Sequence, residues 1–179
     1  MKATKLLLIA LSCMLVIGCK KNKTEDEPTS PAQQTDTISA AELQSYFPYK
    51  NMEQIEFVSV TRWVTYSVIN SKLSYNDKQM SLSTTMSGKE LGDTTPSYHL
   101  SLSAEVTNGT ALRIDFRYRE GIDETQAIYT HDITKDGKLP DTIEFSGEDI
   151  KVTIKKDKGL TEYYHISMND QWQFLRVVE

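Results

Sequence analysis

The side chains that could bind a metal or act as catalysts are few and scattered. The three histidines, His99, His131 and His165, have no partner at the short spacings typical of metal sites. His99 and His165 fall on the polar faces of alternating segments. No serine lies in a Gly-x-Ser-x-Gly motif, and no glycine-rich phosphate loop is present. We therefore expect no metal and no other cofactor.

Paired carboxylates are the remaining catalytic candidates. Asp123-Glu124 and Glu148-Asp149 are neighbours in expected turns. Glycoside hydrolysis needs two carboxyl groups about 5 to 9.5 Å apart across a cleft, and acidic residues in turns are normally solvated. We expect no catalytic residue, so the protein is not expected to be an enzyme.

Aromatic side chains are the strongest candidates for a binding site. Seven large rings fall in segments that read as strands, and all of them can point toward one interior: Trp63, Tyr98, Phe116, Tyr118, Tyr164, Trp172 and Phe174. Rings in such positions either pack as a core or line a pocket for a small apolar ligand. The sequence leaves both interpretations open.

The composition is that of an ordinary globular protein. The 179 residues are 39% hydrophobic and 25% charged, with a formal net charge of −5. An excess of acidic residues argues against a nucleic-acid partner, whose phosphates require a basic surface. Two cysteines are too few for a disulfide scaffold.

The N-terminus reads as a secretory signal. Residues 6–17 are almost entirely apolar after a short basic start, and about 12 residues reach roughly 18 Å, too short for the ~30 Å hydrocarbon core. The signal ends in Val16-Ile17-Gly18-Cys19, which resembles the lipobox of bacterial lipoproteins. The resemblance implies removal of residues 1–18 and lipidation of Cys19, and so a membrane anchor of palmitate-like acyl chains with no spanning helix.

Residues 19–37 read as the lipidated cysteine followed by a disordered tether. Residues 20–37 are rich in charge and proline and carry no apolar side chain larger than alanine, so they cannot bury enough surface to offset their ordering entropy. Asp36-Thr37-Ile38 resembles a bacterial O-glycosylation site, which makes Thr37 the expected site of modification.

Residues 38–179 are expected to form a single β domain. A capping box beginning at Ser39 predicts one short helix over 40–46. Alternating segments separated by tight turns follow at about ten-residue spacing, which indicates an antiparallel meander of about 8–10 strands. We expect this all-β meander to close into a small lipocalin-like barrel or half-barrel, with a β-sandwich as the alternative.

Two hairpin registers can be predicted because one face of each strand must stay apolar. A three-residue loop at 107–109 pairs Val106 with Thr110. A three-residue loop at 157–159 pairs Val152 with Tyr164, which turns Tyr164 inward and His165 outward.

The lipobox, the tether, the segment Tyr46-Phe47-Pro48-Tyr49-Lys50 and the closing meander together resemble small lipoproteins of Bacteroidota-type gut anaerobes, many of which carry uncharacterised lipocalin-like or calycin-like domains. This resemblance implies an outer-membrane lipoprotein on the periplasmic or cell-surface face. It transfers no catalytic residue.

Two functions remain open from the sequence. The first is a non-catalytic binding module of the cell envelope that holds a small apolar ligand or a glycan, for which a cavity is expected. The second is an interaction protein with a filled core that docks onto another envelope protein through its outer sheet face. Leu175 and Val177 beside Trp172 and Phe174 favour the second, because they add an apolar second face to the last strand.

Overall fold

The computed structural model describes residues 37–76 and 78–178. These residues form an all-β unit with two short helices. The elements in chain order are α1 (Ala40–Tyr46), β1 (Gln54–Val58), β2 (Trp63–Asn76), β3 (Gln79–Glu90), β4 (Tyr98–Thr107), β5 (Ala111–Glu120), β6 (Asp123–Asp132), α2 (Ile133–Asp136), β7 (Thr142–Ser146), β8 (Ile150–Lys155), β9 (Gly159–His165) and β10 (Asp170–Val178). The expected signal peptide, Cys19 and most of the expected tether lie outside the described residues. Within those residues, no helix is long and apolar enough to cross a membrane.

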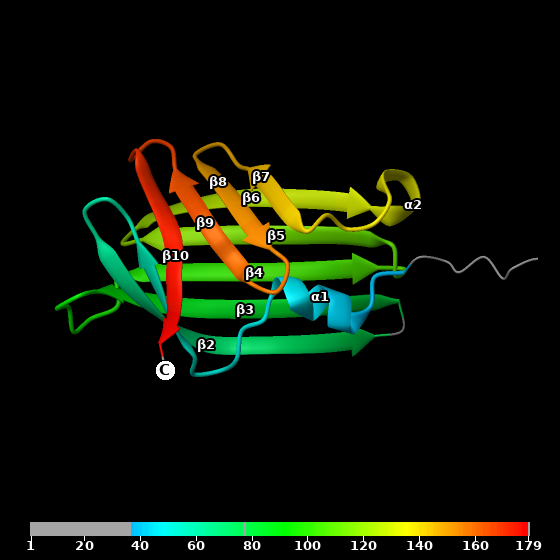
Figure 1. Cartoon of the computed structure of the whole chain (residues 1–179), viewed down its shortest axis with the longest axis horizontal. Coiled ribbons are helices and arrows are strands. Elements are labelled where there is room, and N and C mark those ends of the chain that lie inside the picture. The colour runs from blue at the N-terminus through cyan, green and yellow to red at the C-terminus, as the bar shows by residue number, and fades with distance from the viewer. Residues whose placement is uncertain (1–36, 77, 179) are drawn as a thin grey trace, which may run out of the picture. The chain divides into compact units, whose positions relative to one another are not determined.

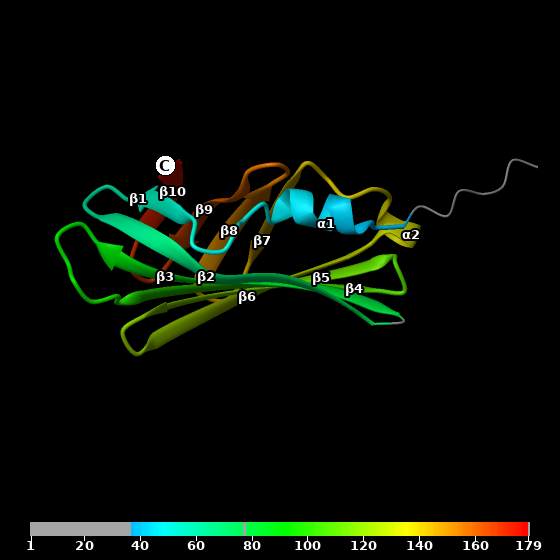
Figure 2. The ribbon, with the colours of Figure 1, turned by 90° about the horizontal axis from the view of Figure 1, so that it is seen from below.

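The ten strands form one antiparallel sheet that is nearly closed into a barrel. Each strand pairs with its neighbour in sequence from β1 to β6 and from β7 to β10, and β10 pairs with β1 (Figure 1). The strands β7 to β10 and helix α1 lie on the same side of the long strands β2 to β6 (Figure 2). The predicted antiparallel meander and barrel are thus confirmed. The strands form one continuous sheet and not the two separate sheets of a β-sandwich.

The barrel is closed between its two edge strands by a single bridge. Ala127 of β6 pairs with Gly147, which follows β7. A Cβ atom on Gly147 would lie 1.8 Å from the backbone oxygen of Gln126, so only glycine allows the two backbones to approach this closely.

Helix α1 forms as the sequence predicts. The Ser39 Oγ accepts a hydrogen bond of 3.1 Å from the Glu42 backbone N–H, as an N-cap does. Leu43 and Tyr46 are fully buried, and the Tyr46 hydroxyl donates to the Pro140 carbonyl at 2.8 Å. The helix therefore fixes the segment between β6 and β7 in addition to covering the core.

The β4–β5 turn has the predicted length but a different register. Thr107 pairs with Ala111 and Val106 with Leu112, so Val106 does not pair with Thr110. Asn108 and Gly109 both have positive φ, 52° and 75°, as a type I′ turn requires. The Asn-Gly pair thus sets the turn, and Thr110 is the additional residue that keeps the apolar faces matched.

The predicted register of the β8–β9 hairpin is wrong. Val152 pairs with Tyr163 instead of Tyr164, and Ile150 pairs with His165. The pairing skips one residue of β9 between its partners for Thr153 and Ile154, which is a β-bulge. A bulge reverses which side chains face inward beyond it, so Tyr163 and His165 are buried and Tyr164 faces outward.

Candidate functional site

Aromatic rings fill the interior of the barrel around Tyr163. Its ring centroid lies 5.3 Å from that of Tyr118, 5.9 Å from Phe116 and 6.0 Å from Trp172, onto which it stacks. The Tyr163 hydroxyl shares a 3.0 Å hydrogen bond with that of Tyr66. All five side chains are at most 1% exposed. Rings at such distances are in contact, so they leave no room among them for a ligand.

The structure brings together four of the seven predicted interior aromatics as fully buried residues: Tyr98, Phe116, Tyr118 and Trp172. Phe174 is only partly buried and packs edge-on against Phe57 at 6.0 Å. Trp63 was predicted to face inward but is 39% exposed, because Val64 and Tyr66 occupy the inward positions of β2. Tyr164 also faces outward, and its hydroxyl donates to Asn169 at 2.8 Å.

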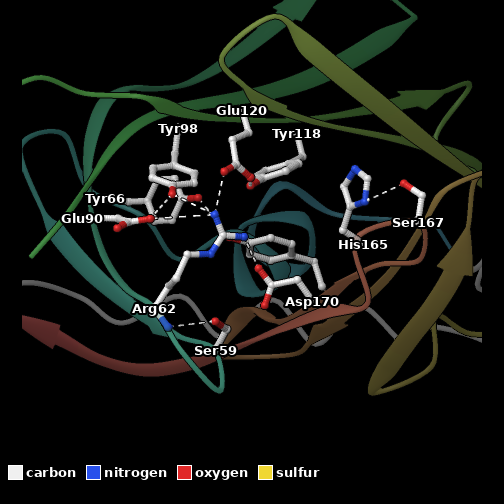
Figure 3. A network of polar contacts seen from close by, with 11 residues as sticks. Ser59, Arg62, Tyr66, Glu90, Tyr98, Tyr118, Glu120, His165, Ser167 and Asp170 are labelled. Atoms are coloured by element: carbon white, nitrogen blue, oxygen red, sulfur yellow. Dashed lines mark hydrogen bonds and ion pairs between the residues drawn. The ribbon is translucent and has the colours of Figure 1, made fainter.

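Arg62 is the centre of a charged cluster at one end of the barrel. Its Nη1 donates to Glu120 Oε1 at 2.6 Å and to the Tyr98 hydroxyl at 3.0 Å. Its Nη2 bonds Asp170, and Glu90 lies 3.8 Å from Nη1 (Figure 3). We call Arg62, Glu90, Glu120 and Asp170 the Arg62 cluster. It joins the β1–β2 turn to the ends of β3, β5 and β10.

The cluster keeps its arginine charged in a partly buried place. The guanidinium lies 4.9 Å above the Trp172 ring, a cation–π distance. Burial alone lowers the pKa of Arg62, but the hydrogen bonds that it donates to Asp170 and Glu120 outweigh burial and raise that pKa above its ordinary value. The pKa of Tyr98 is also raised, chiefly by burial and then by its bond to Glu90. Nη1 and Nη2 of Arg62 are already bonded to these partners. We therefore interpret the cluster as a structural tie between strands.

Sequence reasoning missed the Arg62 cluster and Tyr163. The three carboxylates of the cluster lie at the ends of β3, β5 and β10, between 28 and 108 positions from Arg62, and no local pattern links them. Tyr163 lies one position from the tyrosine that was predicted to face inward, and only the bulge in β9 distinguishes the two.

The three histidines do not come together. His165 is buried, with Nδ1 3.3 Å from the Ser167 hydroxyl, so its predicted place on a polar face is wrong. His131 hydrogen-bonds the Tyr129 hydroxyl and the Gly137 carbonyl. His99 pairs with Arg119 across β4 and β5, and its partial burial, followed by that charge, lowers its pKa. In residues 37–76 and 78–178 no group of three or more potential metal ligands is present.

The feature best suited to hold a ligand is a groove beside the C-terminal strand. It has a volume of about 490 Å³ and lies between the segment after α1 and the β8–β9 turn. Ile55, Phe174 and Val177 form its apolar floor, whereas charged side chains line its rim: Glu53, Lys155, Asp157 and Lys158. Val177 is 44% exposed and Phe174 is partly buried, so part of this apolar surface is open to a ligand.

Tyr49 forms a fixed wall of the groove. Its hydroxyl accepts a 2.5 Å hydrogen bond from the Leu160 backbone N–H, and burial raises its pKa above the ordinary value. A Cβ atom on Gly159 would lie 2.4 Å from that hydroxyl. The absence of a side chain at Gly159 therefore allows Tyr49 to pack against the β8–β9 hairpin.

A second depression, of about 460 Å³, lies on the outer face of β7 to β10. Most of its lining is polar or charged: Glu144, Ser146, Lys151, Thr153, Glu162, Tyr164 and Gln171. Such a lining is ordinary for the solvent face of a sheet. The groove with the apolar floor is therefore the better candidate, because small-molecule sites are mainly apolar with a few polar groups.

No family model, no curated protein and no solved structure matches this chain. The geometry of the groove and of the Arg62 end is therefore the basis for the functional proposals that follow.

Proposed function

We propose that the protein is a lipid-anchored lipoprotein of the bacterial outer membrane whose β domain binds a small amphipathic ligand without catalysis. The observation that carries the proposal is the groove floored by Ile55, Phe174 and Val177. Its volume of about 490 Å³ falls within the 300–1,000 Å³ typical of ligand pockets.

The chemistry of the groove favours one apolar chain with a polar head group. Each methylene that leaves water for the apolar floor contributes about 0.8 kcal/mol. The rim carries both signs of charge, with Lys155, Asp157 and Lys158 at the β8–β9 turn and Glu53 just before β1. A polar head group can therefore remain at the rim, in contact with water and a charge, while the chain covers Phe174 and Val177.

A glycan receives less support than an amphipathic ligand. Sugars bind by stacking on exposed rings, and the most exposed tyrosine, Tyr75, is 65% exposed on β2, away from the groove. Tyr46, Tyr66, Tyr98, Tyr118 and Tyr163 are all at most 3% exposed. We therefore place the apolar or amphipathic ligand first.

The anchoring part of the proposal is supported by the sequence. The basic start, the apolar segment and the lipobox ending at Cys19 point to lipidation there. Thr37, the proposed O-glycosylation site, is exposed in the structure. A glycan on Thr37 would increase the intact mass of the protein measured by mass spectrometry. Every buried side chain of the described part lies between Ile38 and Trp172, so the unit that holds the groove packs its own core.

The proposal can be tested with a matched pair of variants on β10. Val177 and Leu175 are 44% and 43% exposed, but only Val177 lines the groove. We expect the chain from Lys20 onward to bind a dansylated undecanoic acid, with enhanced fluorescence that dodecanoate reverses. Val177→Asp should weaken binding at least tenfold because it places a charge on the apolar floor, whereas Leu175→Asp should change it less than twofold. Absence of binding, or equal effects of both variants, would contradict the proposal.

The outer sheet face remains the basis of the alternative function, docking onto an envelope protein. The structure separates the two residues that favoured this alternative. Val177 belongs to the groove, and Leu175 is the residue skipped by the β1–β10 pairing. Their combined apolar surface on the outer face is thus smaller than expected from the sequence.

A further inference from the structure

Apolar side chains project from the turns at the end of the barrel that holds the Arg62 cluster. Four turns lie at this end, which we call the Arg62 end: 59–62, 91–97, 121–122 and 166–169 (Figure 1). A fifth turn, 147–149, lies beside the 166–169 turn and is bridged to the middle of β6. Val60, Leu91 and Ile122 are 95%, 83% and 97% exposed, and Met168 is 41% exposed. Aliphatic residues at the tips of turns add nothing to the core, and apolar surface rimmed by polar residues is typical of an interaction site.

The Arg62 cluster ties together the turns that carry these four apolar tips. Each tip lies within two residues of a member of the cluster: Val60 of Arg62, Leu91 of Glu90, Ile122 of Glu120, and Met168 of Asp170. The ion pairs that converge on one guanidinium therefore hold four turns of distant sequence in one place. A surface held in this way loses little conformational freedom when a partner binds.

The charge of the Arg62 end restricts what this partner can be. Residues 59–62, 89–97, 119–124, 146–149 and 165–170 contain eight acidic and three basic side chains, a net charge of −5. A second copy presenting the same end, or an anionic lipid surface, would meet like charge. A partner with basic and apolar side chains complements both features.

The chain joins the unit at the opposite end. The Ile38 backbone N–H donates to the Gly109 carbonyl at 2.7 Å, in the β4–β5 turn. The Arg62 end is therefore the end farther from the point where residues 1–36 attach.

We propose that the Arg62 end is a docking surface for a cationic amphipathic segment of a partner protein. The four apolar tips contact the apolar residues of that segment, and the surrounding carboxylates attract its lysine or arginine residues. This inference does not depend on the groove, which lies beside the β8–β9 turn at the other end of the strands.

The test uses a fluorescein-labelled 18-residue peptide of lysine and leucine in an amphipathic helical pattern. We expect it to bind the chain from Lys20 onward in fluorescence anisotropy at low salt, and peptides with glutamate for lysine or serine for leucine to bind at least tenfold more weakly. The variant Val60→Ser/Leu91→Ser/Ile122→Ser should weaken binding at least tenfold. The matched control Ile69→Ser/Tyr75→Ser, at exposed apolar sites on β2, should change it less than twofold.

A charge variant keeps the test decisive if the apolar variant is unstable. Asp93→Asn/Asp123→Asn/Glu148→Gln changes carboxylates outside the Arg62 cluster and should weaken binding and reduce its dependence on salt. The proposal is overturned if the peptide does not bind, if neither variant weakens binding more than the control, or if the apolar tips instead mediate self-association in sedimentation or binding to phosphatidylglycerol vesicles.

Discussion

At the scale of single residues, the structure predicts that Arg62 contributes to stability. Its side chain is 24% exposed and forms ion pairs with Glu120 and Asp170, which are 24% and 13% exposed. Arg62→Met leaves these carboxylates close together without a cation, so we expect a loss of about 2–3 kcal/mol in the free energy of unfolding, less than for a fully buried pair because water still screens the site. Urea denaturation measures this loss.

The matched control is Arg117→Met. Arg117 contacts Asp115 and Glu124 but is 53% exposed, and exposed pairs contribute little. This variant should lose less than about 0.5 kcal/mol. Equal losses for the two variants would show that the Arg62 cluster is not a structural tie.

The buried tyrosines predict how stability depends on pH. Burial is the main cause that raises the pKa of Tyr46 to about 12, above about 10 in an unfolded chain. As the pH rises from 10 toward 12, the unfolded state loses this proton first, so the free energy of unfolding falls. Below pH 10 the contribution is fully present.

Tyr46→Phe should make this fall shallower by removing one titrating group, although it also loses the bond to Pro140, worth about 1 kcal/mol at neutral pH. Tyr75→Phe removes the hydroxyl of an exposed tyrosine and is the matched control. The measurement is urea unfolding between pH 8 and 11.5. Stability that stays flat up to pH 11.5 would contradict the burial of the tyrosine hydroxyls.

At the scale of elements, the closure of the barrel depends on Gly147. Gly147→Ala places a methyl group against the Gln126 carbonyl, so the bridge to Ala127 must open. We expect a loss of about 2 kcal/mol, typical of a clash that moves backbone, and faster amide exchange in β6 and β7. Ser146→Ala, at an exposed neighbouring position, should stay within about 0.5 kcal/mol of the parent. Unchanged exchange in Gly147→Ala would show that this bridge does not close the sheet.

The elements also show how far the sequence leads. Helix α1 and the meander could be predicted because a capping box and strict alternation are local signals. The register of the β8–β9 hairpin could not, since the bulge in β9 depends on the packing of Tyr163 inside the finished barrel. The groove could not be predicted from the sequence either, because Tyr49, Ile55 and Val177 come together only when β10 pairs with β1.

At the scale of the whole unit, the described residues form three regions that could serve different roles: the interior, the groove beside β10 and the Arg62 end. The interior is filled by rings that pack around Tyr163. The groove beside β10 and the apolar turns of the Arg62 end both remain open to solvent. We infer that binding takes place on the surface of the barrel and that its interior serves stability.

The most direct test of this account is a ¹⁵N–¹H NMR titration of the chain from Lys20 onward with dodecanoate. We predict shifts that saturate and that map to the residues around Tyr49, Ile55, Phe174 and Val177, while the amides next to Phe116 and Tyr163 keep their positions. Shifts centred on Phe116 and Tyr163 would mean that the ligand enters the barrel, and an unchanged spectrum would mean that the groove does not bind such a chain. Either result would contradict the account.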